Sequence, residues 1–159
     1  MDTTAADINF NEKGICNYCE DFINLSRVYN LKKNEKQNKL KELINEIREN
    51  GKNKKYDCIV GVSGGVDSSY VLSLVKKEGL RPLAVHMDNG WNSELAQNNI
   101  GNLVRSLNVD LFTYVIDWEE YKKMMKSFFD SDVIDIELLM DNAMLAVNYQ
   151  QASYHNIKY

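Results

Sequence analysis

The sequence has no hydrophobic run long enough to cross a membrane. Its apolar stretches fall short of the ~18 residues that a transmembrane helix needs. The start, Met1-Asp2-Thr3-Thr4, lacks the basic region and apolar core of a secretory signal. We therefore expect a cytoplasmic protein with no membrane span, in a compartment where thiols stay reduced.

An excess of basic charge is also missing. The chain has 19 Lys and Arg against 23 Asp and Glu, a net charge of −4. It therefore has no global attraction to nucleic acid or to an anionic membrane, and we expect neither as a partner. Hydrophobic residues make up 44% and charged residues 26% of the 159 residues, which is ordinary for a soluble globular domain.

Cysteine is scarce, and its odd number excludes full pairing in disulfides. Cys16 and Cys19 have the spacing of half a zinc site, which supplies two of the four ligands that tetrahedral zinc needs. Three interpretations stay open: a zinc knuckle, two plain thiols, or a redox pair. The last normally requires a helix amino terminus after a strand, which the pattern does not indicate. Cys58 lies in an apolar run and is expected in the core.

Strand-like and helix-like patterns alternate in the second part of the chain. An apolar run predicts a buried strand over 57–62, and two further runs predict strands over 82–87 and 111–116. Helical spacing predicts helices over 68–78, 118–129 and 137–155, and one more between the second and third strands. This alternation predicts an α/β fold with a parallel sheet, right-handed crossovers and helices on both faces.

The first part of the chain is more polar. Residues 1–30 hold a short polar segment with the Cys-x-x-Cys pair, a partial knuckle. Residues 31–55 form an amphipathic helix and linker, with Leu40, Leu43, Ile44 and Ile47 at helical spacing and an end near Gly51. Residues 56–159 are expected to form the nucleotide-binding domain.

A loop rich in glycine and serine joins the first predicted strand to the next helix: Val62-Ser63-Gly64-Gly65-Val66-Asp67-Ser68-Ser69. The first N–H groups of a helix have no partners within it, and they form an anion site at the positive end of the helix dipole. The glycines let the backbone approach an anion and adopt φ > 0. The hydroxyls of Ser63, Ser68 and Ser69 can donate to phosphate oxygens. Asp67 either caps the helix or holds a Mg²⁺ ion that bridges to the phosphates.

Other motifs of this kind are absent or incomplete. No lysine ends the loop, as the Gly-x-x-x-x-Gly-Lys-Ser/Thr motif requires. Residues 61–65 do satisfy the Gly-x-Ser-x-Gly pattern of serine hydrolases. A hydrolase also needs a downstream acid followed by a histidine, and the chain has only His86 and His155. His86 precedes every credible acid on a later strand, and His155 lies on a helical pattern near the end, so we favour the phosphate interpretation.

Ser63-Gly64-Gly65-Val66-Asp67-Ser68 resembles the signature of the ATP pyrophosphatases, which have the adenine nucleotide alpha hydrolase-like fold. Three further segments are similar to the N-acetyl sugar amidotransferases of bacterial surface polysaccharide and lipopolysaccharide synthesis: residues 86–96, 117–121 and 14–19. The resemblance implies ATP-dependent amidotransfer to a nucleotide-linked or lipid-linked N-acetyl sugar. ATP activates the acetamido oxygen, and ammonia from a separate glutaminase subunit displaces AMP. This chain would be the ATP-binding part.

The resemblance also implies roles for single residues. Ser63 to Ser69 would cradle the pyrophosphate with Mg²⁺ at Asp67, and Met87 would border the adenine. Asp88 would reach the ribose or substrate, or instead cap the helix that begins near Ser93. The implied catalytic residues are Asp67, Ser68 and Asp141, the last as a second metal or substrate ligand. Around it this chain has Leu139-Met140-Asp141-Asn142-Ala143 in place of the expected Pro-Thr-Asp-His-Ala.

The family pattern extends beyond both ends of this chain. An earlier Cys-x-x-Cys would complete a zinc site, and a fourth strand would pair on the far side of the first in a sheet of order 3-2-1-4. We therefore expect the first strand to be an edge through which a homodimer can form, and an isolated chain that binds ATP without turnover. Two alternatives stay open: a tRNA thiolation enzyme, which the acidic composition disfavours, and a non-catalytic nucleotide-binding module.

Overall fold

The computed structural model describes residues 2–29 and 33–159. The chain divides into two compact units, Met1–Glu42 and Leu43–Tyr159. Among the described residues, no helix combines the length and apolar character needed to span a bilayer.

The amino-terminal unit contains a helix that the sequence pattern did not predict. Phe10 and Cys16 form an isolated antiparallel bridge around a turn in which Gly14 has φ +73°. Helix α1 (Asn17–Tyr29) follows at once, and α2 (Lys33–Asn50) begins in this unit. The partial knuckle expected over 1–30 stays a prediction. The helix predicted within 31–55 is present as α2, and residues 31 and 32 of that range lie outside the described residues.

The second unit is built on a parallel sheet. Its strands are β1 (Cys58–Gly61), β2 (Pro82–Asp88) and β3 (Asp110–Val115), in the order β1-β2-β3. Val60 pairs with Ala84, and Val85 with Phe112, in parallel register. The predicted fold class is confirmed, and so is the order of the first three strands.

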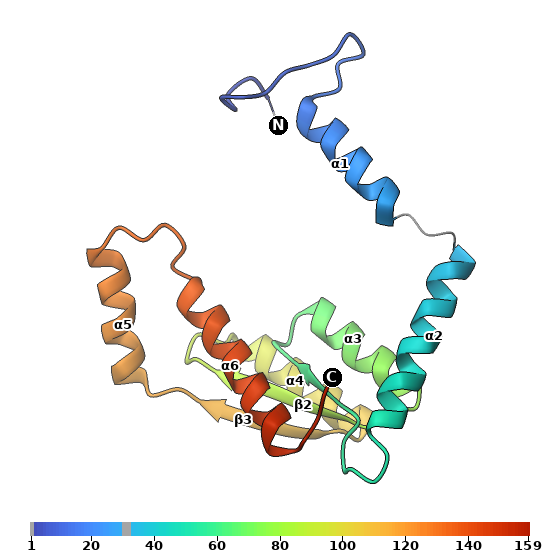
Figure 1. Ribbon diagram of the computed structural model, residues 1–159. Helices are drawn as coiled ribbons and strands as arrows, with labels where there is room; N and C mark the ends of the chain where they lie inside the picture. The colour runs from blue at the N-terminus through green and yellow to red at the C-terminus, as the bar shows by residue number, and fades with distance from the viewer. Residues whose placement is uncertain (1, 30–32) are drawn as a thin grey trace. The chain divides into compact units, whose positions relative to one another are not determined.

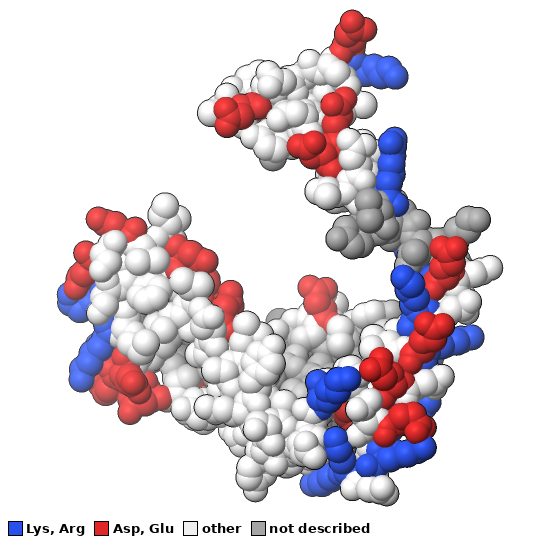
Figure 2. All heavy atoms as spheres, in the orientation of Figure 1, with Lys and Arg blue, Asp and Glu red and all other residues white. Residues whose placement is uncertain are grey.

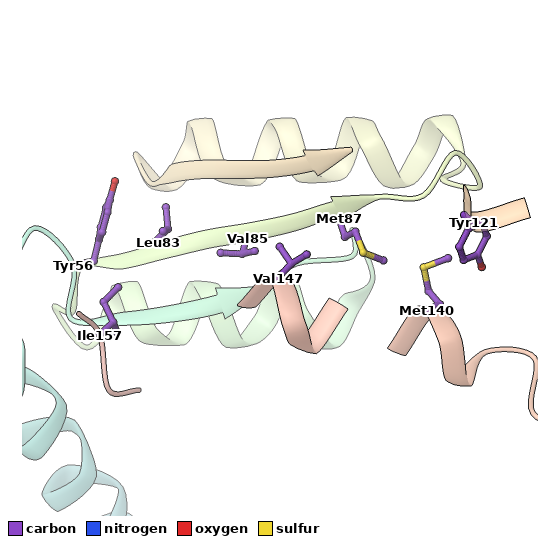
Figure 3. Packing of buried hydrophobic residues seen from close by; sticks show 8 residues of the cluster. All are labelled: Tyr56, Leu83, Val85, Met87, Tyr121, Met140, Val147 and Ile157. Carbon is purple, nitrogen blue, oxygen red and sulfur yellow. The ribbon is translucent and has the colours of Figure 1, made fainter. Parts of the chain in front are cut away.

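Helices cover both faces of the sheet (Figure 1). One face packs against α3 (Val66–Lys77) and α4 (Glu94–Leu107) through a cluster of Val60, Val62, Leu72, Ala84 and Ile100. The other face packs against α6 (Leu138–Tyr154). Figure 3 shows this second cluster, in which the three alternate β2 residues Leu83, Val85 and Met87 face Val147 and Met140. Helix α5 (Trp118–Asp130) contributes Tyr121 to it.

The two edges of the sheet differ. The predicted third strand is confirmed as β3, although its residues Leu111, Tyr114 and Val115 are exposed. On the outer side of β1, the Ile59 N–H donates to the Tyr159 carbonyl at 2.9 Å. The chain that follows α6 therefore runs beside β1, where a fourth strand was expected. Association of two copies through this edge stays a prediction.

Candidate functional site

The loop between β1 and α3 depends on one glycine for its shape. Gly64 has φ +79°, and a Cβ there would lie 2.4 Å from the Ala96 carbonyl oxygen of α4. Asn99, also on α4, donates from Nδ2 to the Gly64 carbonyl at 3.2 Å. Gly65 has φ −80°, so the expected positive φ is wrong for this residue. A Cβ on Gly65 would meet only Ser63 Oγ, at 3.4 Å. The fold therefore requires glycine at 64, whereas a Cβ at 65 would make only one van der Waals contact, with Ser63 Oγ.

Serine hydroxyls hold the loop in place. Ser68 Oγ accepts from the Ser63 N–H at 3.3 Å and lies 3.3 Å from Ser63 Oγ. The Gly65 N–H donates to Ser63 Oγ at 3.4 Å, and Ser69 Oγ donates to the Gly65 carbonyl at 2.7 Å. These bonds bring the predicted serines together at one turn and fix the loop before any ligand binds.

The amino terminus of α3 has no side-chain cap. Gly65 is at the N-cap position, and no side chain accepts a hydrogen bond from the first turn. Asp67 lies in that turn and is exposed, so the alternative in which it caps the helix is wrong. Val66 beside it is 80% exposed. A helix that begins without a side-chain cap after a glycine turn can bind a phosphate group, because its free N–H groups and its dipole both favour an anion.

A cavity of about 440 Å³ lies beside this loop at the carboxyl ends of β1 and β2. Its walls come from Gly61, Val62 and Ser63, from Val85 and Met87, and from one side of α6, namely Asp141, Met144, Leu145, Val147 and Asn148. Its size is that of a small-molecule site, and ligands of open parallel sheets bind at this edge. The structure thus brings Ser63, Met87 and Asp141 to one cavity, with apolar walls suited to a flat base.

Asp88 is the last residue of β2 and its side chain holds the turn that follows. Its Oδ1 accepts from the Gly90 N–H at 3.0 Å and from Asn92 Nδ2 at 3.2 Å. Helix α4 is capped by Ser93, whose Oγ accepts from the Ala96 N–H, so the capping role considered for Asp88 is wrong. A contact of Asp88 with ribose or substrate stays a prediction.

The buried His86 connects this turn to the loop. Its Nδ1 lies 2.9 Å from the Val62 carbonyl oxygen. Because a carbonyl only accepts, Nδ1 carries the proton and Nε2 accepts from Asn92 Nδ2 at 3.3 Å. His86 therefore has a structural role at the end of β1, and it is not placed as the base of a hydrolase.

Sequence reasoning missed two asparagines. Asn99 holds the Gly64 carbonyl, as described above. Asn148 lies against Gly61, where a Cβ would come within 3.1 Å of its Nδ2. Its Nδ2 donates to the Met144 carbonyl, and its Oδ1 is buried without a partner. A single asparagine within a helical pattern carries no sequence signal of such a role.

The cysteine pair lies at the start of α1. The two sulfurs are 3.4 Å apart, with Cys16 buried and Cys19 exposed. The Cys19 backbone N–H lowers the pKa of the Cys16 thiol, and the neighbouring Cys16 sulfur raises the pKa of Cys19. Among residues 2–29 and 33–159, no three His, Cys, Asp or Glu form a group that could hold a metal. Zinc at this pair stays a prediction that needs two more ligands.

Known proteins match this chain over most of its length. The NAD synthase family model matches residues 35–156. An uncharacterised protein of Methanocaldococcus jannaschii is 34% identical over 114 residues, which are 71% of this chain and 39% of that protein. A glutamine-hydrolysing GMP synthase of Thermus thermophilus is 36% identical over 95 residues, 58% of this chain and 18% of the enzyme. The chain spans well under half the length of these relatives.

Solved structures show the same fold. The NMN synthetase of Francisella tularensis superposes with a TM-score of 0.53 and 22% identity over 74% of this chain and 50% of the synthetase. The NH3-dependent NAD synthetase of Campylobacter jejuni gives a TM-score of 0.55 and 18% identity over 76% of this chain and 53% of that structure. At these identities the similarity concerns the fold.

Proposed function

We propose a function on one premise: the chain belongs to the NAD synthase family. That family and this fold are consistent with the ATP pyrophosphatases. The proposal is that the chain binds ATP with Mg²⁺ on residues 63–69 and takes part in an ATP-dependent amidation. In that reaction a carbonyl or amide oxygen is adenylated and ammonia then displaces AMP from the carbon. The observation that carries it is the uncapped start of α3 beside a cavity that Ser63, Met87 and Asp141 share.

The geometry supports a division of labour among the residues. The N–H groups at the start of α3 and the hydroxyls of Ser63 and Ser68 bind the β and γ phosphates. Gly61, Val85 and Met87 form the apolar wall that receives the adenine. The acceptor oxygen attacks the α phosphate, pyrophosphate leaves, and ammonia then displaces AMP. The chain contributes mainly positioning and charge stabilisation.

Two carboxylates suit a magnesium ion. Asp67 lies in the first turn of α3, and Asp141 lines the cavity from α6. Magnesium usually binds through one or two carboxylates together with substrate phosphates, so these two residues are a sufficient protein contribution. When bound, the ion neutralises charge on the phosphates.

The proposed acceptor is an N-acetyl sugar, linked to a nucleotide or to a lipid. Its support is the similarity of residues 86–96, 117–121 and 14–19 to sugar amidotransferases; the relatives described above are NAD, NMN and GMP synthetases instead. On the side shown in Figure 2, Lys and Arg are interspersed with Asp and Glu over α2 and form no continuous basic surface. That arrangement favours a small acceptor over tRNA. Ammonia would come from a glutaminase partner; the GMP synthase relative is named as a glutamine-hydrolysing enzyme.

The test is the release of AMP and pyrophosphate in the presence of Mg-ATP and an ammonium salt. We expect release to depend on a nucleotide-linked sugar that carries an acetamido group. The matched control is the same sugar nucleotide with a free amine, which lacks the acetamido oxygen that ATP would adenylate.

Equal release with both sugars would contradict the acceptor. Because the chain alone is expected to bind ATP without turnover, the assay is run on a protein extended to the full family pattern. ATP binding without AMP formation by that longer protein would support the non-catalytic module instead. The nucleotide site itself is tested separately by titration calorimetry with Mg-ATP.

A further inference from the structure

Cys16 and Cys19 form a chemically competent pair that ATP binding does not use. Their sulfurs are 3.4 Å apart. A disulfide needs about 2.05 Å between sulfurs, so a small side-chain rotation closes the gap. Cys16 immediately precedes α1 and Cys19 lies in its first turn, which is the placement of reactive Cys-x-x-Cys pairs. We propose that Cys16 and Cys19 are a reversible dithiol-disulfide couple that exchanges with external thiols and disulfides.

The number of ligands favours this chemistry over a metal. Tetrahedral zinc takes four ligands, whereas a redox couple needs two sulfurs. In the part of the chain that the structure describes, no group of three or more potential ligands includes this pair. Cys58 belongs to β1 in the other unit. The two sulfurs are therefore sufficient for a disulfide but supply only two of the four ligands that zinc needs.

Burial assigns different tasks to the two sulfurs. Cys16 is 6% exposed, whereas Cys19 is exposed. Both cysteines border a cavity of about 420 Å³ whose other walls are Tyr18, Phe22 and Ile23. An external disulfide therefore meets Cys19 first. Cys16 lies within reach to attack the Cys19 sulfur in the second step, so it is the resolving thiol.

The exchange balances in two steps. The Cys19 thiolate attacks a disulfide RSSR, forms a Cys19-S-S-R bond and releases one thiolate. The Cys16 thiolate then attacks the Cys19 sulfur, forms the internal disulfide and releases the second thiolate. The protein loses two electrons and two protons, and RSSR becomes two RSH. In the reverse direction a thiol attacks Cys19, and Cys16 is a good leaving group because the Cys19 N–H lowers its pKa.

The test uses the full chain equilibrated with mixtures of reduced and oxidised glutathione. Thiols are trapped with a maleimide and counted by intact mass. We expect the wild-type protein to lose two thiols together, with a mass loss of two hydrogens and no retained glutathione. Cys58 should remain a thiol, since burial in β1 raises its pKa to about 12.

Two variants test the order of events. Cys16→Ser should retain one glutathione on Cys19, because the resolving thiol is gone. Cys19→Ser should stay a thiol in native buffer, because Cys16 is buried. Cys58→Ser is the matched control and should behave as wild type.

Several results would overturn the proposal. Glutathione retained on the wild-type pair would show that the two sulfurs do not resolve each other, and equal labelling of Cys19→Ser and Cys16→Ser would refute the assigned roles. One zinc per two chains, protecting both thiols from oxidation, would establish a shared metal site instead. The wild-type titration tests the proposal even if Cys16→Ser fails to fold. None of these results depends on whether the chain binds ATP.

Discussion

Gly64 and Gly65 lie next to each other at the start of α3, and each lacks a side chain for a different physical reason. At Gly64 both the left-handed backbone and the contact with the Ala96 carbonyl exclude a Cβ. At Gly65 φ is −80° and a Cβ would meet only Ser63 Oγ, so the fold does not require glycine there. The missing side chain leaves room for a ligand to approach the backbone. The first residue is needed by the fold, and the second by the proposed ligand.

Gly64→Ala should therefore destabilise the protein. The left-handed conformation costs about 1–2 kcal/mol for a residue with a Cβ, and the 2.4 Å contact adds to that cost. We expect a loss of about 3 kcal/mol in the free energy of unfolding, measured by urea denaturation. Gly79→Ala is the control, because Gly79 has φ +77° with nothing near its Cβ and bears the conformational cost alone. Equal losses for the two variants would show that the Ala96 contact is unimportant.

Only part of the site could be predicted from the sequence at the level of single residues. The loop stands out because two glycines and three serines between a strand and a helix exceed what a turn requires. The capping alternatives for Asp67 and Asp88 failed because either residue type caps helices as readily as it binds ligands, and only the fold shows that Gly65 and Ser93 occupy the cap positions. Asn148 could not be found, since its position over Gly61 is a property of packing between α6 and β1.

At the scale of elements, strands and helices with a buried face were predictable. The pattern of apolar residues located β1, β2, α5 and α6 to within a few residues and indicated α4 without its bounds, because these elements contribute buried residues to the core. Helix α1 was missed: a cysteine precedes it where a common cap would be, and its apolar residues Phe22 and Leu25 are exposed. On β3, apolar residues are exposed, so composition indicated a strand but not its burial.

The starts of β1 and β2 are joined by a partly buried ion pair. Asp57 is 3% exposed, and Arg81 donates to it from Nη2 at 2.5 Å and from its backbone N–H at 2.8 Å. Arg81→Ala leaves this carboxylate buried with fewer donors. We expect a loss of about 3 kcal/mol in unfolding free energy, at the lower end for such pairs because the backbone donor remains.

The control for this pair is Asp130→Ala, which removes the exposed pair with Lys126. That change should cost about 0.5 kcal/mol or less. Both variants are compared by urea denaturation. A cost of Arg81→Ala as small as that of the control would mean that water reaches Asp57 in the folded protein.

For the whole molecule, the core lies in one unit. All three buried clusters belong to residues 43–159. A protein that begins at Lys33, and so keeps the whole of α2, should therefore unfold at the same urea midpoint as the full chain and bind Mg-ATP with the same affinity. Loss of either property would show that residues 1–32 support the nucleotide-binding unit.

The central claim is that residues 63–69 and the adjoining cavity bind ATP, and titration calorimetry with Mg-ATP tests it most directly. Wild-type protein should bind one ATP. Gly65→Val should abolish binding while changing the free energy of unfolding by no more than about 1 kcal/mol, because a Cβ there meets only Ser63 Oγ and the side chain enters the space that the phosphate must occupy. Gly101→Ala, a control on α4 away from the loop, should leave affinity unchanged. Unchanged affinity in Gly65→Val, or no binding by wild type, would contradict the claim.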